Sequence, residues 1–217
     1  MNKFPNASAT LLWGPKDLEL CLRRTAAHWA EWEPCFSIRT QPLREFKLLN
    51  NSALFAEFVG DFGLRWVYFR LEADAFRMSL KVNMNFKRAI QYGCSRSLDL
   101  AADEVRNGAG ARQLSALSKI AMFAKTDVFL PFDRWSRLGL RKLQGQSYPD
   151  YASFHDSAMD LLREDAWVEF KKFVIQHPLC PKGSAKNAFF MRAVDMALMT
   201  IGGRWSRPNL MKLRSAL

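Results

Sequence analysis

Cysteine and histidine are scarce in this sequence of 217 residues, which contains four cysteines and three histidines. The cysteines form no Cys-x-x-Cys pair, and no stretch has the spacing of a zinc or iron–sulfur ligand set. The sequence therefore predicts neither a metal site nor a cofactor. Scattered cysteines are typical of small core residues in a reducing compartment, and we interpret all four in this way: Cys21, Cys35, Cys94 and Cys180.

Long hydrophobic runs are also absent, because no stretch approaches the roughly 18 consecutive apolar residues of a membrane-spanning helix. The first residues, Met1 to Asn6, lack the apolar segment of a secretory signal peptide. The sequence contains no internal repeat, no low-complexity linker, no P-loop and no dinucleotide-binding fingerprint. We therefore expect a cytoplasmic protein that has no membrane partner.

Acidic residues are outnumbered, with 21 Asp and Glu against 32 Lys and Arg, so that the formal net charge is +11. Such an excess favours a polyanionic partner, because each phosphate that a basic side chain neutralises releases condensed counterions. An anionic membrane surface would require a basic amphipathic helix or a polybasic run, and the sequence has neither. The charge balance favours nucleic acid, with an acidic protein partner as the alternative.

Apolar residues recur at helical spacing along most of the chain, which predicts a mainly α fold. Residues 64–71 are dense in aromatics and fit either a small β element or a buried helical turn. We expect a single unit in which an N-terminal lobe (1–94) and a central core (95–145) are followed by C-terminal helices that pack back on the core (146–217). The predicted helices cover residues 17–30, 52–62, 72–92, 95–105, 111–124, 133–143, 153–176 and 186–201.

The segment Val105–Arg112 contains Gly108 and Gly110 between two predicted helices. Glycines allow positive φ angles and let a phosphate approach the backbone closely, and the N–H groups that open the second helix favour an anion. Arg106 and Arg112 flank the turn, and Ser115 lies on the polar side of the following helix, so all three are candidate phosphate contacts. An ordinary helix end followed by a loop is the alternative.

Two helices joined by a glycine turn form a helix-hairpin-helix pattern. The stretch Asp-Val-Phe-Leu-Pro-Phe-Asp comes directly after it, at residues 127–133, and Asp133 stands 23 positions after Gly110. Sequence and spacing resemble the helix-hairpin-helix DNA glycosylases, particularly the bacterial 3-methyladenine type and also the 8-oxoguanine enzymes. The resemblance covers about 30 residues. It implies a helix-hairpin-helix glycosylase fold, double-stranded DNA as the partner, and Asp133 as the catalytic carboxylate.

Each residue that the resemblance singles out has a structural alternative. Asp133 follows Pro131 and precedes a helix, so it also fits a simple N-cap. Aromatic side chains that flank it are candidate walls of a base pocket, although aromatics are more often part of a core: Phe129, Phe132 and Trp135. Arg134 and Arg137 face either phosphate or solvent.

The sequence also departs from the family. Glycosylases that cut the strand use a lysine early in the second helix, where this chain has Arg112 and Gln113. Lys119, about a turn later, is a possible catalytic substitute or a phosphate contact. The hairpin lacks the family's Leu-Pro-Gly opening. A hydrolytic enzyme without lyase activity is therefore expected. Elsewhere, Arg192 and Asp195 interrupt an apolar helix and are predicted to form a local ion pair.

The function that we expect is recognition and hydrolytic excision of a modified or damaged base in DNA. Glycosylase-like proteins also occur in bacterial antiphage defence, and a divergent member would suit such a system together with partner proteins. The alternative is a non-catalytic nucleic-acid-binding module or an accessory subunit of a larger complex. A helical protein with an acidic partner and no nucleic-acid role is a third hypothesis.

Overall fold

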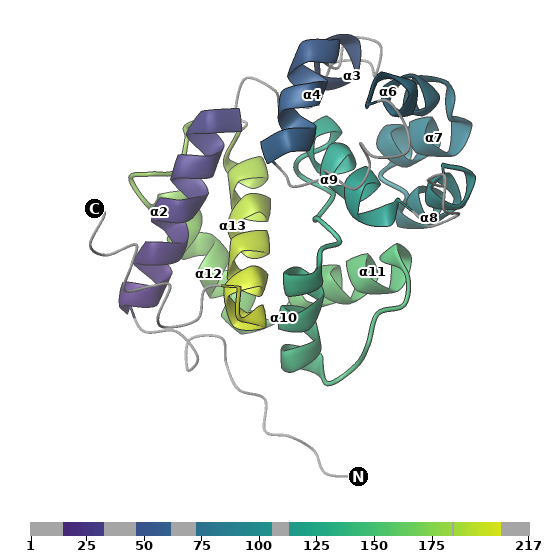
Figure 1. The fold of residues 1–217 in the computed structure, drawn as a ribbon. Helices are drawn as coiled ribbons and strands as arrows, with labels where there is room; N and C mark the ends of the chain where they lie inside the picture. The colour runs from purple at the N-terminus through teal and green to yellow at the C-terminus, as the bar shows by residue number, and fades with distance from the viewer. Residues whose placement is uncertain (1–14, 33–46, 62–72, 106–112, 184, 205–217) are drawn as a thin grey trace.

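The computed structural model describes residues 15–32, 47–61, 73–105, 113–183 and 185–204. Within these ranges every regular element is an α-helix (Figure 1). The prediction of a mainly α fold is thus confirmed. Residues 64–71, for which a small β element was one of two predictions, lie outside the described residues.

The first half of the chain shows how capping residues divide it into helices. Asn51 accepts the backbone N–H of Leu54 at 3.0 Å and so caps the helix that follows. The single helix predicted over 72–92 is wrong, because Asn83 has an extended backbone and accepts the N–H of Phe86 at 2.7 Å, which begins a new helix. The helices are α2 (Pro15–Trp32), α3 (Lys47–Asn50), α4 (Ser52–Asp61), α6 (Ala73–Val82) and α7 (Met84–Tyr92).

The second half of the chain follows the predicted pattern more closely. The helix predicted over 153–176 is, however, two helices, because the chain leaves the helical hydrogen-bonding pattern at residues 162–164. The other four predicted helices begin and end within three residues of their observed bounds. The helices of this half are α8 (Ser95–Glu104), α9 (Leu114–Ala124), α10 (Arg134–Gln144), α11 (Tyr151–Leu161), α12 (Asp165–Gln176) and α13 (Ala185–Gly202).

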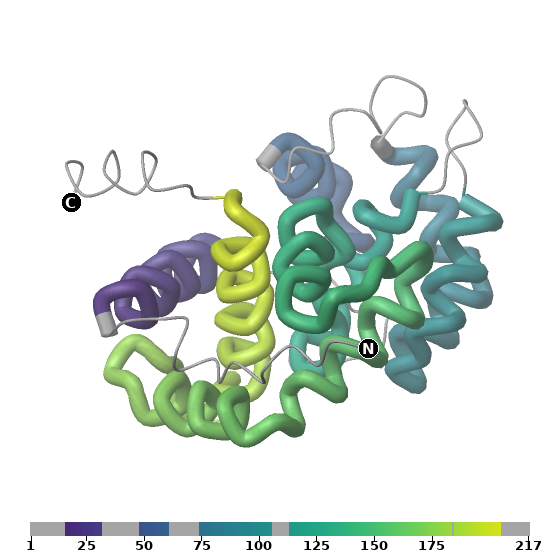
Figure 2. The backbone as a smooth tube through the Cα atoms, turned by 90° about the horizontal axis from the view of Figure 1, so that it is seen from below, coloured from purple at the N-terminus to yellow at the C-terminus, as the bar shows by residue number. Residues whose placement is uncertain are grey.

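Helix α13 lies between α2 and α10 in both ribbon and tube views (Figures 1 and 2). On the α2 side, the rings of Trp29 and Phe189 pack edge to face with centroids 5.7 Å apart. Helix α2, the first helix of the predicted N-terminal lobe, therefore packs against α13. The division of the chain into the consecutive parts 1–94, 95–145 and 146–217 stays a prediction.

On the other side, α10 and α13 meet backbone to backbone at two glycines. A Cβ atom on Gly139 would lie 2.0 Å from the carbonyl oxygen of Leu198, and one on Gly202 would lie 2.1 Å from that of Trp135. Real Cβ atoms do not approach this closely, so only glycine permits the contact at either position. This close approach places the first turn of α10 directly against α13.

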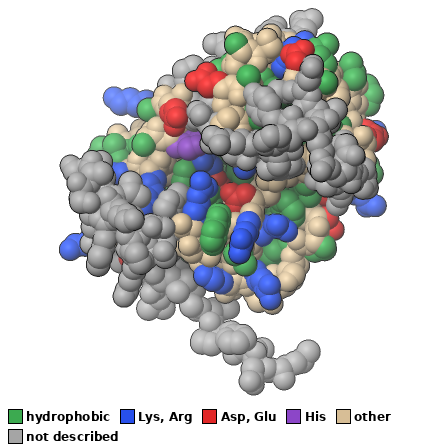
Figure 3. All heavy atoms as spheres, in the orientation of Figure 1, with side chains coloured by type: hydrophobic (Ala, Val, Ile, Leu, Met, Phe, Trp, Pro, Cys, Tyr) green, Lys and Arg blue, Asp and Glu red, His purple; other side chains and the backbone are tan. Residues whose placement is uncertain are grey.

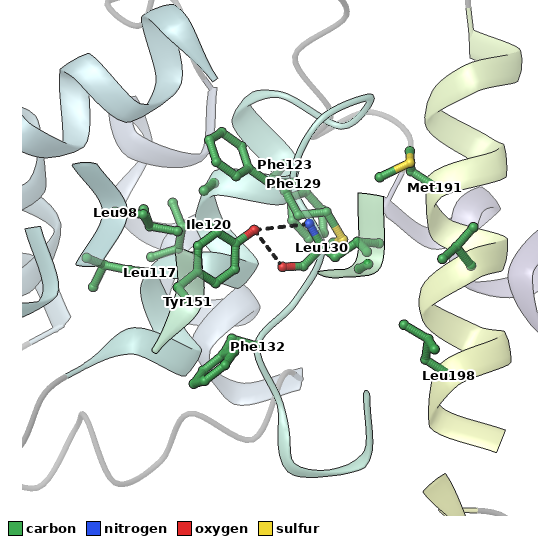
Figure 4. Close-up of a cluster of buried hydrophobic side chains, with 14 of the residues drawn as sticks. Leu98, Leu117, Ile120, Phe123, Phe129, Leu130, Phe132, Tyr151, Met191 and Leu198 are labelled. Atoms are coloured by element: carbon green, nitrogen blue, oxygen red, sulfur yellow. Dashed lines mark hydrogen bonds between the residues drawn. The ribbon is translucent and has the colours of Figure 1, made fainter. Parts of the chain in front are cut away.

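The buried side chains form one hydrophobic cluster that draws on helices from α2 to α13. In Figure 4 the chain between α9 and α10 runs through this cluster, with residues of α8 and α9 on one side of it and residues of α13 on the other. None of the described helices is both long and apolar enough to cross a bilayer.

Candidate active site

The connection between α9 and α10, residues 125–133, is anchored to α11. The hydroxyl of Tyr151 donates to the carbonyl oxygen of Leu130 at 3.0 Å and accepts the N–H of the same residue at 3.2 Å (Figure 4). His155 Nε2 lies 3.0 Å from the carbonyl oxygen of Val128, and since a carbonyl only accepts, Nε2 carries the proton. Both side chains are buried, so they hold the connection inside the core.

Helix α9 holds the same connection one residue before Asp133. The hydroxyl of Ser118 accepts the backbone N–H of Phe132 at 2.8 Å and donates to the carbonyl oxygen of Ser115 at 3.1 Å. Ser118 is fully buried, so no water competes for these bonds. The backbone that leads into Asp133 is therefore tied to two different helices.

Asp133 is the N-cap of α10, with φ −102° and ψ 170°. Its Oδ1 accepts the backbone N–H groups of Trp135 at 2.7 Å and of Ser136 at 2.8 Å. The capping interpretation of Asp133 is confirmed, and the catalytic one stays a prediction. Capping occupies only Oδ1, and within the described residues Oδ2 accepts no hydrogen bond. The side chain is half-buried, so this second oxygen is not sealed in the core.

A buried ion pair lies on α13 opposite this cap. Arg192 Nη1 donates to Asp195 Oδ2, and Ser136 Oγ donates to Asp195 Oδ1 at 2.7 Å. The side chains of Arg192 and Asp195 are only 6% and 1% exposed. The predicted local pair is confirmed, but it is part of the core and not of a solvated face.

Burial changes the ionisation of these groups. It raises the pKa of Asp195 to about 6, and the neighbouring Arg192 guanidinium is the largest influence in the opposite direction. Burial also lowers the pKa of His28 on α2 to about 3, with Arg192 and Arg204 acting in the same direction. The result is a cluster of interacting ionisable groups that includes Arg192 and Asp195 on α13, His28 on α2 and Asp133 on α10.

Lys119 extends this cluster to α9. Burial lowers its pKa, while the negative charges of Asp133 and then Asp195 raise it. Lys119 is half-buried, so it is not a fully solvated surface residue. The structure thus brings the two predicted catalytic residues, Asp133 and Lys119, into one electrostatic group.

Two of the three predicted pocket aromatics belong to the core. Phe129 is fully buried against Tyr151, with ring centroids 6.1 Å apart, and Phe132 packs edge to face on Phe154 at 5.4 Å. Phe129 has no exposed surface to offer to a base in this conformation. Trp135 is half-exposed on the first turn of α10, so it is the one member of the set that reaches the surface.

Basic side chains follow the outer face of α10, and Figure 3 shows Lys and Arg gathered over this helix. Arg134 is exposed, with its guanidinium 5.2 Å from the centre of the Trp135 ring. Arg137 is half-buried over the ring of Phe132 at 4.5 Å, and Lys142 donates to the carbonyl oxygen of Ile201 at 2.8 Å. Of Arg134, Arg137 and Lys142, Arg134 is therefore the most available.

The predicted hairpin residues Arg106, Gly108, Gly110 and Arg112 lie outside the described residues. Ser115, near the start of α9, is half-buried. The predicted contacts of these five residues with nucleic acid stay predictions. In the described parts of the chain, no three His, Cys, Asp or Glu side chains gather in a way that would hold a metal ion.

Sequence reasoning missed the residues that hold the site together, namely Ser118, Ser136 and Tyr151. It predicted the pair of Arg192 and Asp195 but not the burial of the pair or its contact with Ser136. A charged pair inside an otherwise apolar helix was the available signal, since such residues are seldom buried without partners. Comparison with protein-family models, with curated proteins and with solved structures finds no match to this chain.

Proposed function

We propose that this chain is a DNA glycosylase of the helix-hairpin-helix type, which excises a modified or damaged base from duplex DNA by hydrolysis. Asp133 is its catalytic carboxylate. The observation that carries the proposal is the state of that side chain: Oδ1 is fixed by two backbone N–H groups of α10, whereas Oδ2 has no hydrogen-bond partner among the described residues. Oδ1 therefore orients the carboxylate, and Oδ2 takes part in the reaction.

The chemistry suits a carboxylate of this kind. As the bond between C1′ and the base nitrogen breaks, its electron pair leaves with the base and positive charge develops on the sugar. Asp133 stabilises that charge and takes the proton that the attacking water loses when its oxygen bonds to C1′. The departing base takes up a proton from solvent, so the products are a free base and an abasic site.

The surroundings of Asp133 support this role. The connection that presents it is tied to Ser118 and Tyr151, so little reorganisation accompanies the reaction. Lys119 lies in the same electrostatic group, and we assign it to charge balance beside Asp133. Arg134 on the outer face of α10, together with the net charge of +11, supports a phosphate backbone as the partner.

The test is a single-turnover assay on duplex oligonucleotides that each carry one damaged or modified base. Alkaline cleavage reveals the abasic sites. Asp133→Asn should abolish base release and leave the affinity for the duplex unchanged, because Asn caps a helix about as well as Asp. The loss should be about 100-fold or more in rate.

Asp150→Asn is the matched control, because Asp150 caps α11 through the N–H of Ser153 at 2.8 Å, in the way that Asp133 caps α10. It should release base at the wild-type rate. If Asp133→Asn is as active as Asp150→Asn, Asp133 only caps its helix. Salt-sensitive binding of duplex DNA without any base release would support the non-catalytic module instead.

A further inference from the structure

Ser136 joins two carboxylates that are far apart in the sequence. Its backbone N–H donates to Asp133 Oδ1 at 2.8 Å, and its hydroxyl donates to Asp195 Oδ1 at 2.7 Å. Ser136 is fully buried, so both hydrogen bonds form without competition from water. A single residue therefore connects the proposed catalytic carboxylate on α10 to the buried ion pair on α13.

Stability alone does not account for that ion pair. Arg192 and Asp195 are 6% and 1% exposed, and taking both charges out of water carries a large desolvation penalty. Apolar residues of similar volume generally stabilise a core as well or better. The Nε of Arg192 is also buried and has no hydrogen-bond partner among the described residues, which adds to the desolvation penalty of the pair.

We propose that Asp195 is a positioning residue for Asp133, which it orients through Ser136, and that Arg192 holds Asp195 in place. This inference rests on the proposed function of Asp133. Asp195 is too deeply buried to touch DNA, so it acts by fixing the first turn of α10. The donors to Asp133 belong to that turn, and a small shift of the turn would move Oδ2 of Asp133 away from the reacting sugar.

The charge of Asp195 makes the inference testable. Several groups from the packed elements influence its ionisation or are influenced by it: Arg192 on α13, Arg204 just after α13, Asp133 on α10, Lys119 on α9, and Cys21 on α2. With burial the dominant cause, the pKa of Asp195 is about 6. Asp195 is therefore charged above that pH and neutral below it, where its attraction for Arg192 is lost.

The first variant is Asp195→Asn, which has the shape of protonated Asp195 at every pH. At about pH 8 it should release base about 10-fold more slowly than the wild type. The wild-type rate should fall as the pH drops through about 6, whereas the variant should show no step in that range. The two rates should converge near pH 5. A role in stability alone would not produce this convergence.

The second variant, Ser136→Ala, cuts the connection and keeps both charges, so it serves where Asp195→Asn does not fold. Base release should fall about 10-fold, and the step near pH 6 should disappear. Thr25→Val is the matched control, because the Thr25 hydroxyl is equally buried but bonds only within its own helix, to the carbonyl oxygen of Cys21 at 2.9 Å. It should keep both the rate and the pH step.

An NMR titration measures the same coupling without catalysis. The amide resonances of Trp135 and Ser136 should shift with a midpoint near pH 6 in the wild type and lose that step in Asp195→Asn. Titrating amides in a protein that releases no base would support the coupling and sink the proposed function. Base release with the same pH profile in wild type and Asp195→Asn, and with amides that do not titrate, would overturn the positioning role alone.

Discussion

Helices α10 and α11 begin with the same local pattern, Asp-x-x-Ser, at Asp133–Ser136 and Asp150–Ser153. In each, the aspartate is extended and its side chain accepts the N–H of the serine at 2.8 Å. The two serine hydroxyls differ. That of Ser153 donates back to the carbonyl oxygen of Asp150 at 3.2 Å, whereas that of Ser136 donates across to Asp195 on α13.

The surroundings of the two helix starts explain this difference. The start of α11 receives a second carboxylate, because Asp99 on α8 accepts the N–H groups of Tyr151 and Ala152 at 2.9 and 2.8 Å. The backbone N–H groups in the first turn of α11 thus donate to two carboxylates, those of Asp99 and Asp150. The start of α10 lies against α13, where a buried charged pair offers its own acceptor. The local sequence is thus enough to form a helix cap, whereas the environment of the cap depends on the helix that packs against it.

The largest effect that we expect on stability comes from breaking the ion pair behind α10. Arg192→Met leaves Asp195 buried without its counter-charge and should lower the free energy of unfolding by about 3–5 kcal/mol. The double variant Arg192→Met/Asp195→Leu should recover most of this loss. Chemical denaturation measures both, and an undamaged single variant would contradict the buried pair.

The deficit of Arg192→Met should also depend on pH. Burial raises the pKa of Asp195 above its unfolded value, so the native state favours the protonated carboxyl. Stability from this group is therefore fully present below about pH 4 and is lost as the pH rises through about 6. The deficit should grow as the pH rises above about 6, because only there is wild-type Asp195 charged and attracted to Arg192. A deficit that shrinks with rising pH would show that the sign is wrong.

The next largest effect should come from separating α10 and α13. Gly139→Ala places a Cβ atom 2.0 Å from the carbonyl oxygen of Leu198, so the helices must move apart. We expect a loss of about 3 kcal/mol in the free energy of unfolding. Gly60→Ala in α4 is the control, since no atom lies within 4 Å of its added Cβ. It should raise stability by about 0.5–1 kcal/mol.

Removing either of the two caps should lower the stability of the protein by nearly the same amount. Asp133→Ala and Asp150→Ala each remove one capping side chain and should each cost about 1 kcal/mol in thermal or chemical unfolding. The same pair should differ strongly in base release, which only Asp133→Ala abolishes under the proposed function. A much larger stability loss for Asp133→Ala would show that its role in the fold exceeds that of a cap.

The smallest effect should come from the serine of α11. Ser153→Ala removes a half-buried hydroxyl that bonds only to the preceding turn, so the free energy of unfolding should change by about 0.5 kcal/mol or less. Ser136→Ala removes a fully buried hydroxyl and leaves Asp195 short of a donor, which should cost about 1–3 kcal/mol. Equal losses would remove the distinction between the two helix starts.

Most helices could be predicted because helical spacing and capping depend on residues within a few positions of one another. Asp133 was recognised as a possible cap for this reason. The break at Asn83 was not predicted, because apolar spacing continues across it and only the capping geometry of Asn83 ends one helix and begins another. The predicted pocket walls Phe129 and Phe132 show the same limit, since an aromatic pattern does not say which side of the chain faces the core.

The sequence by itself determined the helical class of the fold, the N-cap at Asp133, the pairing of Arg192 with Asp195, and the basic charge. Each of these depends on residues close in the chain or on composition alone. Only the tertiary structure decided that Ser136 reaches Asp195, 59 positions away, and that Lys119 lies in the electrostatic group of Asp133. The physical reason is packing, because the glycine contact of α10 with α13 brings Ser136 and Asp195 together inside the core.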